Sequence, residues 1–198
     1  QMCIRDRTSA SYFTKTTLET NLFFHNKVNG YVYTSGGSFT SPASLPTGPY
    51  VAGTAFLDSY VFVGVASNNK IYNCNEGDPT TWDPANAIVF EQTADSLVAI
   101  SKHLNYVVAF GKTSTQFYYD TGAATGSPLG VAQSYTLETG CASGDSVVSS
   151  DNTVLWVGTT RAQGRSVFML DGVSPVKIST NNIDKILDRD DLAKVTAY

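Results

Sequence analysis

Short hydrophobic runs alternate with polar turns along the chain, and three of these runs lead into a glycine in the same way. Each run is rich in Val, Tyr and Phe, and Gly, Asn, Asp and Ser flank it. This composition is typical of β-strands. The three runs cover residues 60–63, 106–110 and 154–157. The glycines that follow are Gly64, Gly111 and Gly158, an interval of 47 residues each time.

The surroundings of the three runs repeat as well. A turn rich in Asn, Asp and Ser comes before each run, and a second hydrophobic run follows each glycine after another polar turn. Each central pair therefore predicts a β-hairpin. The second strands are expected at residues 70–73, 115–119 and 166–170, and a further strand is expected ahead of each pair at 51–56, 96–101 and 145–149.

A repeat of three or four strands every ~40–50 residues is the signature of a β-propeller blade. We therefore predict an all-β, β-propeller-like fold with blades of about 47 residues; a β-sandwich with coincidental spacing is the alternative. The glycines are expected to end strands where the chain turns. The expected organisation is a non-native, adapter-derived tail at 1–7, an irregular first blade at 12–45, and repeats at 50–95, 96–143 and 144–190.

Closed propellers need ~4–8 blades, so the chain is expected to be a partial β-propeller at 8–198 that folds poorly alone. Residues 34–44 and 121–128, rich in Gly, Ser, Thr and Pro, are predicted loops. One short helix is expected at residues 183–187, with Asn182 as its N-cap.

Composition narrows the range of functions. The chain has 198 residues, 42% hydrophobic and only 15% charged, and its net charge is −4 with a pI near 5.0. The sign of the charge excludes a strongly basic nucleic-acid binder. The sequence contains no apolar run of 18 residues, so no membrane-spanning helix is predicted. Low charge with 12% aromatic residues suits a protein whose surface meets other proteins in an assembly.

Three segments imitate known binding motifs. Gly111, Lys112 and Thr113 resemble the end of a phosphate-binding loop, but Tyr106 stands where that motif needs a glycine, so a hairpin turn is favoured. Residues 73–78 resemble a calcium loop, yet Tyr72 falls where the first carboxylate belongs. The acidic residues near the end of the chain are interpreted as a solvated helix face rather than a cation site. They are Asp184, Asp188, Asp190 and Asp191.

The remaining reactive side chains form no recognisable constellation in the sequence. His25 and His103 are far apart and have no neighbouring Cys, so zinc is not expected. Cys74 and Cys141 are interpreted as buried free thiols. The sequence has no G-x-S-x-G elbow. We therefore predict no catalytic, cofactor-binding or metal-binding residue, no cofactor, and a protein that is not an enzyme.

Several short motifs occur in an order that resembles one family, the packaged-DNA stabilization proteins. These are the tail accessory factors, or head completion proteins, of short-tailed double-stranded DNA phages. The resemblance covers roughly residues 20–190. Gln116 departs from it, because the family usually carries an acidic residue there, and the later blades with His and Trp are missing. The motifs lie at residues 30–33, 78–82, 110–111, 114–117, 120–122, 140–142 and 178–183.

The resemblance implies a virion structural protein of the head–tail connector. Such a protein assembles below the portal as a homo-oligomeric ring, closes the channel and retains packaged DNA without sequence-specific contact. Its implied partners are the portal and other tail proteins; its implied location is the virion, and the host cytoplasm during assembly. No membrane partner is implied. A charge of −4 per copy would repel the duplex from the channel wall.

Two other function classes remain open from the residues. One is a carbohydrate-binding or carbohydrate-cleaving β-propeller protein, which would gather acidic residues and the aromatic side chains of Trp82, Tyr118 or Trp156 at one end. The other is a receptor-binding tail module, which would expose these aromatic residues on a distal loop surface.

Overall fold

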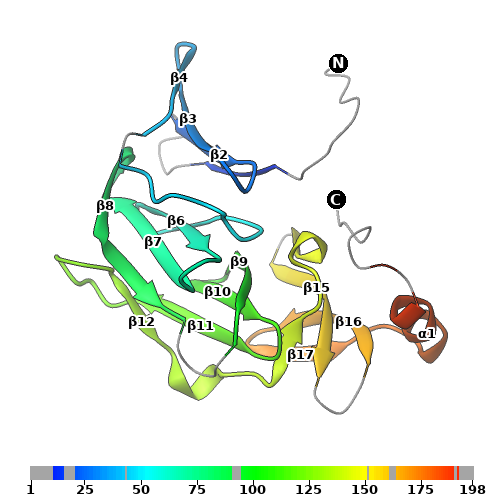
Figure 1. Ribbon diagram of the computed structural model, residues 1–198. Helices are drawn as coiled ribbons and strands as arrows, with labels where there is room; N and C mark the ends of the chain where they lie inside the picture. The colour runs from blue at the N-terminus through cyan, green and yellow to red at the C-terminus, as the bar shows by residue number, and fades with distance from the viewer. Residues whose placement is uncertain are drawn as a thin grey trace.

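Four antiparallel sheets, formed one after another along the chain, make up the described part of the protein. The computed structural model describes residues 11–15, 21–42, 44–90, 95–150, 152–160, 164–189 and 191. The sheets follow one another around an arc (Figure 1). The fold is therefore all-β and propeller-like, as the repeat predicts.

The first three sheets are up-and-down meanders, in which strands that are consecutive in the chain pair with one another. The first sheet contains β1 (Tyr12–Lys15), β2 (Asn21–His25), β3 (Gly30–Thr34) and β4 (Ser38–Thr40). The second contains β5 (Ala55–Leu57), β6 (Tyr60–Val65), β7 (Lys70–Asn75) and β8 (Asp78–Val89). The third contains β9 (Leu97–His103), β10 (Tyr106–Gly111), β11 (Thr115–Asp120) and β12 (Leu129–Val131). The fourth contains β13 (Thr139–Cys141), β14 (Val148–Ser150), β15 (Thr153–Thr160), β16 (Arg165–Asp171) and β17 (Ser174–Lys177). In the fourth sheet, β13 and β14 both pair with β15.

The three predicted central hairpins are confirmed as the antiparallel pairs β6–β7, β10–β11 and β15–β16. The repeated glycines all lie in the first strand of these hairpins, but only Gly111 ends its strand. The expectation that each glycine ends a strand is therefore wrong for Gly64 and Gly158. Close packing explains them, because a Cβ at Gly64 would lie 2.5 Å from Val51 Cγ2, and one at Gly158 would lie 2.6 Å from Phe168 Cδ2.

The sheets pack face to face through alternating side chains. Because successive residues of a strand point to opposite faces, each inner sheet contributes to two hydrophobic clusters. In β6, Val61 and Val63 pack toward the first sheet, whereas Phe62 packs toward the third. Between the third and fourth sheets, Phe110 of β10 packs on Trp156 of β15, with ring centroids 5.2 Å apart. Three buried clusters thus hold the four sheets together.

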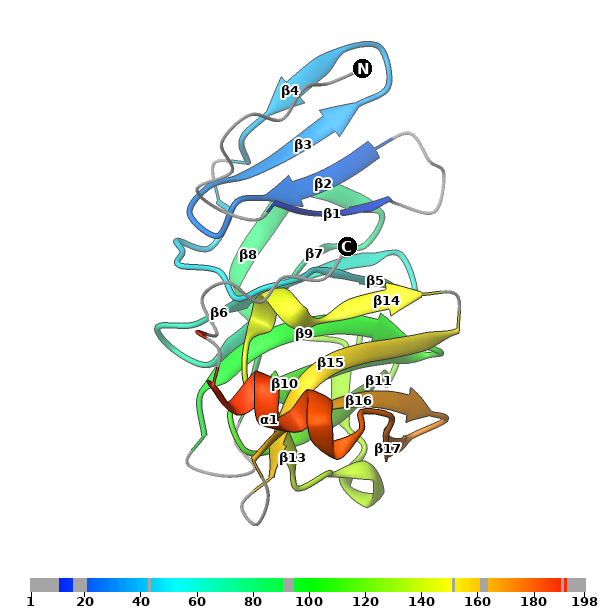
Figure 2. The same cartoon turned by 90° about the vertical axis from the view of Figure 1, so that its right-hand side faces the viewer.

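The innermost strands of the four sheets are β1, β5, β9 and β14, and they lie beside one another in the middle of the molecule (Figure 2). Contacts join β1 to β5, β5 to β9, and β9 to β14. Ahead of β5, Ala52 forms an isolated parallel bridge with Ala99 of β9. In the fourth sheet two short strands share the place of one inner strand. Both β13 and β14 pair with β15, and a 3₁₀ turn at Gly144–Ser146 separates them.

Several predicted boundaries differ from the structure. The strand expected at 51–56 is reduced to β5, because Gly53 at φ +82° breaks the extended conformation. The strand expected at 145–149 is shifted to β14 by the 3₁₀ turn. The predicted loop at 34–44 contains β4. The helix is α1 (Asn181–Arg189), and Asn182 lies inside it; Thr180 instead accepts the first helical hydrogen bond, from the Asp184 N–H.

The long strand β8 is absent from the sequence prediction. It contains Pro79 and Pro84, which usually argue against a strand. As an outer strand it pairs only with β7 and tolerates both prolines. Among the described residues, no helix is long and apolar enough to cross a membrane.

Candidate functional site

The turn that resembles a phosphate-binding loop already holds an anion from its own chain. It lies between β10 and β11, and the carboxylate of Asp95 accepts six hydrogen bonds from it and from Ser96. Backbone N–H groups of Lys112, Thr113 and Ser114 donate at 3.0, 2.8 and 3.1 Å. The donors that would hold a phosphate are therefore occupied, and the hairpin interpretation is confirmed.

The ionisation of Asp95 follows from these contacts. Burial by itself would raise the pKa of this carboxyl, but the hydrogen bonds from Thr113, Ser96 and Ser114 outweigh it and hold the pKa below its usual value. Lys112 also meets the fourth sheet, where Thr159 Oγ1 donates to its carbonyl oxygen at 3.0 Å. Asp95 thus fixes a turn on which the neighbouring sheet packs.

The segment that resembles a calcium loop is a tight turn between two strands. Residues 73–75 belong to β7, and Glu76 and Gly77 form the turn, with Gly77 at φ +70°. The Asp78 carboxylate accepts hydrogen bonds from the Thr80 and Thr81 hydroxyls at 2.5 and 2.7 Å. These hydrogen bonds lower the pKa of Asp78. Its oxygens serve the start of β8 rather than a cation.

The acidic residues near α1 bind separate partners. Asp184 pairs with Lys177 Nζ at 2.5 Å and accepts a hydrogen bond from the Ser179 hydroxyl, which together lower the pKa of Asp184. Asp188 accepts the Arg165 N–H at 2.7 Å. Asp190 lies outside the described residues. In the described part of the chain, no three His, Cys, Asp or Glu side chains gather as a metal site would require.

The histidines are held by backbone carbonyls. His25 is completely buried; its Nε2 donates to the Gly53 carbonyl at 2.9 Å and its Nδ1 accepts the Lys27 N–H at 3.2 Å. Burial lowers the pKa of His25 to about 4, so the ring is neutral at pH 7. His103 Nε2 donates to the Gly172 carbonyl at 2.6 Å. Each histidine therefore connects two sheets or their linking segments.

Cys74 and Cys141 are buried free thiols, as predicted. Burial raises the pKa of Cys74 to about 11 and that of Cys141 to about 12. Cys74 Sγ accepts the Val61 N–H at 3.1 Å, and Cys141 Sγ donates to the Ser143 carbonyl at 3.1 Å. Thiols with raised pKa values are poor nucleophiles at neutral pH.

The aromatic residues named for carbohydrate stacking are core residues. Trp82, Tyr118 and Trp156 are 3%, 0% and 1% exposed and lie in three different hydrophobic clusters. They neither gather at one end of the sheets nor face a loop surface. The structure therefore contradicts both arrangements that would have assigned them to a sugar or a receptor.

A polar cluster joins the first sheet to the fourth sheet, which lie at the two ends of the arc. The Tyr12 hydroxyl of β1 donates to the Asp145 carboxylate, and Lys27 Nζ pairs with the same carboxylate at 2.6 Å. Burial, followed by the contact with Asp145, raises the pKa of Tyr12 well above its usual value. Nothing in the spacing of these three residues signals the contact, and it was not predicted.

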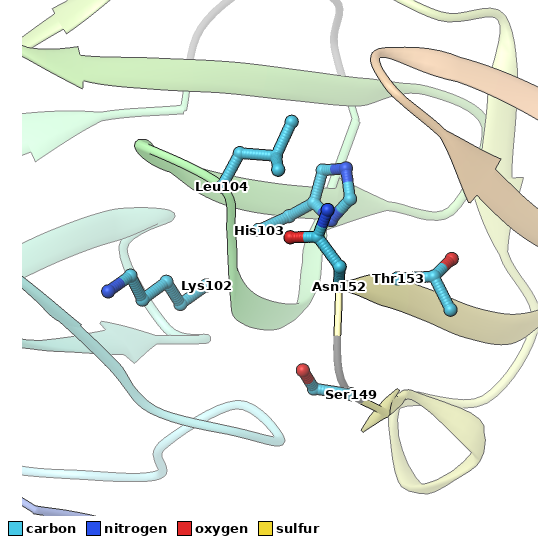
Figure 3. A pocket seen from close by; sticks show the side chains of 6 residues that line it. All are labelled: Lys102, His103, Leu104, Ser149, Asn152 and Thr153. Carbon is cyan, nitrogen blue, oxygen red and sulfur yellow. The ribbon is translucent and has the colours of Figure 1, made fainter.

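A small pocket of about 260 Å³ opens where the turns after β9 and β14 meet (Figure 3). Asn152 points toward His103, whereas Lys102 and Thr153 point to opposite sides. The Thr153 hydroxyl already donates to the Leu170 carbonyl at 2.6 Å. The groups of a catalytic site converge on one position. The groups that line this pocket do not.

The four repeated antiparallel sheets define a β-propeller-like fold. A family model described as "Bacteriophage P22 Gp10, beta-propeller" matches residues 11–198. The chain belongs to this family, the phage stabilisation proteins, and is a phage structural protein. The resemblance drawn from the short motifs is therefore confirmed. No curated protein matches the chain in sequence.

Two solved structures with a similar fold are enzymes. Streptogramin B lyase aligns with a TM-score of 0.58 and 11% identity over 91% of this chain. The dihydro-heme d1 dehydrogenase NirN aligns with a TM-score of 0.54 and 17% identity over 85% of it. The chain spans 59% and 36% of the length of these two structures. At such identities the likeness shows the fold alone.

Proposed function

We propose that this chain is a non-enzymatic component of the phage head–tail connector that helps retain packaged DNA. In this role it assembles below the portal as one copy in a ring, contacts the portal and other tail proteins, and resides in the virion after assembly in the host cytoplasm. The observation that carries the proposal is the family match along residues 11–198.

The chemistry of the described residues supports a structural role. The best-placed carboxylate, Asp95, serves a turn of its own chain, and Cys74, Cys141 and His25 are buried and engaged by backbone groups. Catalytic groups need access to a substrate, and these have none. These groups are instead hydrogen-bonded to backbone groups of their own chain.

The net charge supports a passive contact with DNA. At −4 per copy, a ring of such chains repels the duplex and leaves it free to slide during ejection. Retention then comes from closing the channel together with the neighbouring tail proteins, rather than from Lys or Arg contacts to phosphate. No sequence-specific contact is needed for this function.

The proposal is tested by deleting the reading frame from a phage that carries it. Heads should still fill with DNA but should lose it before or during purification, so DNase digestion should remove most of the packaged genome. Supplying the complete reading frame from a plasmid should restore protection. Heads that keep their DNA without the protein would contradict the proposal.

A further inference from the structure

Two buried amide side chains in the second and third sheets each leave one polar atom without a hydrogen-bond partner. Asn73 of β7 is 0% exposed, and Gln116 of β11 is 1% exposed. Among the described residues, nothing donates to Asn73 Oδ1 and nothing accepts from Gln116 Nε2. Polar groups in a protein interior nearly always have a partner, because it is unfavourable to leave water without gaining one. These two atoms therefore require an explanation.

The other half of each amide group has a partner, and this fixes which atom is left over. Asn73 Nδ2 donates to the Cys74 carbonyl at 3.0 Å, so the oxygen of this amide remains. Gln116 Oε1 accepts the Tyr118 hydroxyl at 2.6 Å, so the NH₂ group of this amide remains. One remaining atom is an acceptor and the other is a donor. The two amides therefore have complementary needs.

The strand register brings both amides into one layer of the protein. Asn73 lies opposite Phe62 in the second sheet, and Gln116 lies opposite Ala109 in the third. Side chains of directly opposite residues share one face of a sheet. Phe62 and Ala109 belong to the same hydrophobic cluster, which is formed by these two sheets. Asn73 and Gln116 therefore both point into the layer between the second and third sheets.

The two amides also lie at neighbouring levels of this layer. A Cβ on Gly64 of β6 would lie 3.5 Å from Ile100 Cγ2 of β9, so these two residues are at the same level. Through the pairing of β9, β10 and β11, Ile100 shares a row of side chains with Gln116. Gly64 lies one row from Asn73 on the same face of the second sheet. Rows on one face are separated by about 7 Å.

The Gln116 side chain extends along its strand toward the row of Asn73. Its hydrogen bond to the Tyr118 hydroxyl directs it toward the end of β11 at Asp120. On β6, the row of Asn73 is displaced from Gly64 toward Tyr60. Tyr60 and Asp120 lie at the same end of the layer, because burial and then nearby acidic groups that include Asp120 raise the pKa of Tyr60.

We infer that one internal water molecule binds between the second and third sheets, where it donates a hydrogen bond to Asn73 Oδ1 and accepts one from Gln116 Nε2. Buried waters make two to four hydrogen bonds to polar groups that otherwise lack partners. A cation does not suit the NH₂ group of Gln116, and an anion does not suit the oxygen of Asn73. Water suits both. The inference is independent of the function proposed above.

A crystal structure of the protein expressed from its complete reading frame, at a resolution that shows ordered water, tests the inference. We expect one density peak within about 3.2 Å of both Asn73 Oδ1 and Gln116 Nε2. A separate water on each amide would overturn the inference. So would rotated side chains that hydrogen-bond to each other directly, or a layer without density at this position.

A double-mutant cycle in the same protein is the second measurement. Asn73→Ala and Gln116→Ala are made singly and together, and the equilibrium constants of unfolding are compared. Because groups that share a water are coupled, the increase in the double variant should be about tenfold smaller than the product of the two single increases.

The matched control combines Asn73→Ala with Gln133→Ala, since Gln133 is an exposed glutamine. The effects in this control should multiply to within about twofold. Equally independent effects for Asn73→Ala and Gln116→Ala would overturn the inference. If a variant does not fold, the density in the crystal of the unmodified protein decides the outcome.

Discussion

Thr113 donates two hydrogen bonds to one oxygen of Asp95, from its backbone N–H at 2.8 Å and from its hydroxyl at 3.1 Å. This pair shows that the backbone N–H groups of a turn that imitates a phosphate-binding loop are engaged by a carboxylate of the same chain. The carboxylate precedes β9, the turn follows β10, and the contact fixes the ends of two neighbouring strands.

Replacing the carboxylate by an amide should therefore be costly. In Asp95→Asn the amide group turns a donor toward backbone N–H groups that cannot accept, so the free energy of unfolding should fall by about 3 kcal/mol at pH 7. Urea denaturation measures this. Asp83→Asn is the control, since Asp83 is exposed, and it should change the free energy of unfolding by less than about 0.5 kcal/mol. Equal effects of the two variants would refute the role of Asp95.

His25 should make the protein less stable at mildly acidic pH. Its pKa is near 6.5 in the unfolded chain and about 4 in the fold, so the unfolded state takes up the proton first. Stability is then complete above about pH 6.5 and declines as the pH falls toward 4, by about 3 kcal/mol in total. Unfolding experiments across this range, with an NMR titration of the ring, check the prediction. A ring that titrates near pH 6.5 in the native protein would contradict it.

Two glycines should tolerate alanine differently, although both face a neighbouring sheet. A Cβ at Gly140 would overlap the backbone carbonyl of Lys112, whereas a Cβ at Gly64 would meet the side chains of Val51 and Leu97. Side chains can shift and backbone cannot without moving the turn. Gly140→Ala should cost about 3 kcal/mol and Gly64→Ala about 1–2 kcal/mol, as measured by thermal or urea unfolding. The reverse order would show that the turn at Lys112 is not fixed.

Cys74 and Cys141 should stay unmodified in the native protein. Their burial and their raised pKa values leave little thiolate at pH 7.5. Exposure to a maleimide for minutes, followed by peptide mass spectrometry, should show both residues unlabelled, and addition of urea should expose both. Fast labelling of either residue in the native protein would contradict the packing described for it.

Much of the fold could be predicted from the sequence because its repeat is local. The 47-residue interval among Gly64, Gly111 and Gly158 reflects equivalent positions on equivalent strands, so the hairpins are encoded within short segments. Strand ends were harder to predict. β5 is short because Gly53 adopts a positive φ, and β14 is displaced by a 3₁₀ turn. The pattern of hydrophobic residues predicts neither of these backbone conformations.

The polar contacts could not be predicted for a different reason. Asp95 meets Thr113 within one sheet, and Asp145 meets Tyr12 across 133 positions, so both contacts depend on how the strands and sheets are finally placed. The same reason explains why the aromatic residues Trp82, Tyr118 and Trp156 could not be assigned from the sequence. Residue type alone does not distinguish a core aromatic residue from one that stacks on a ligand. Long-range placement, rather than residue type, decides these roles.

We propose that this chain forms part of the connector below the portal. Cryo-electron microscopy of intact virions that carry the complete reading frame tests it most directly. We predict propeller density into which the four described sheets fit, repeated in a ring next to the portal. Density for these sheets at the distal tip of the tail, or virions that contain none, would contradict the account.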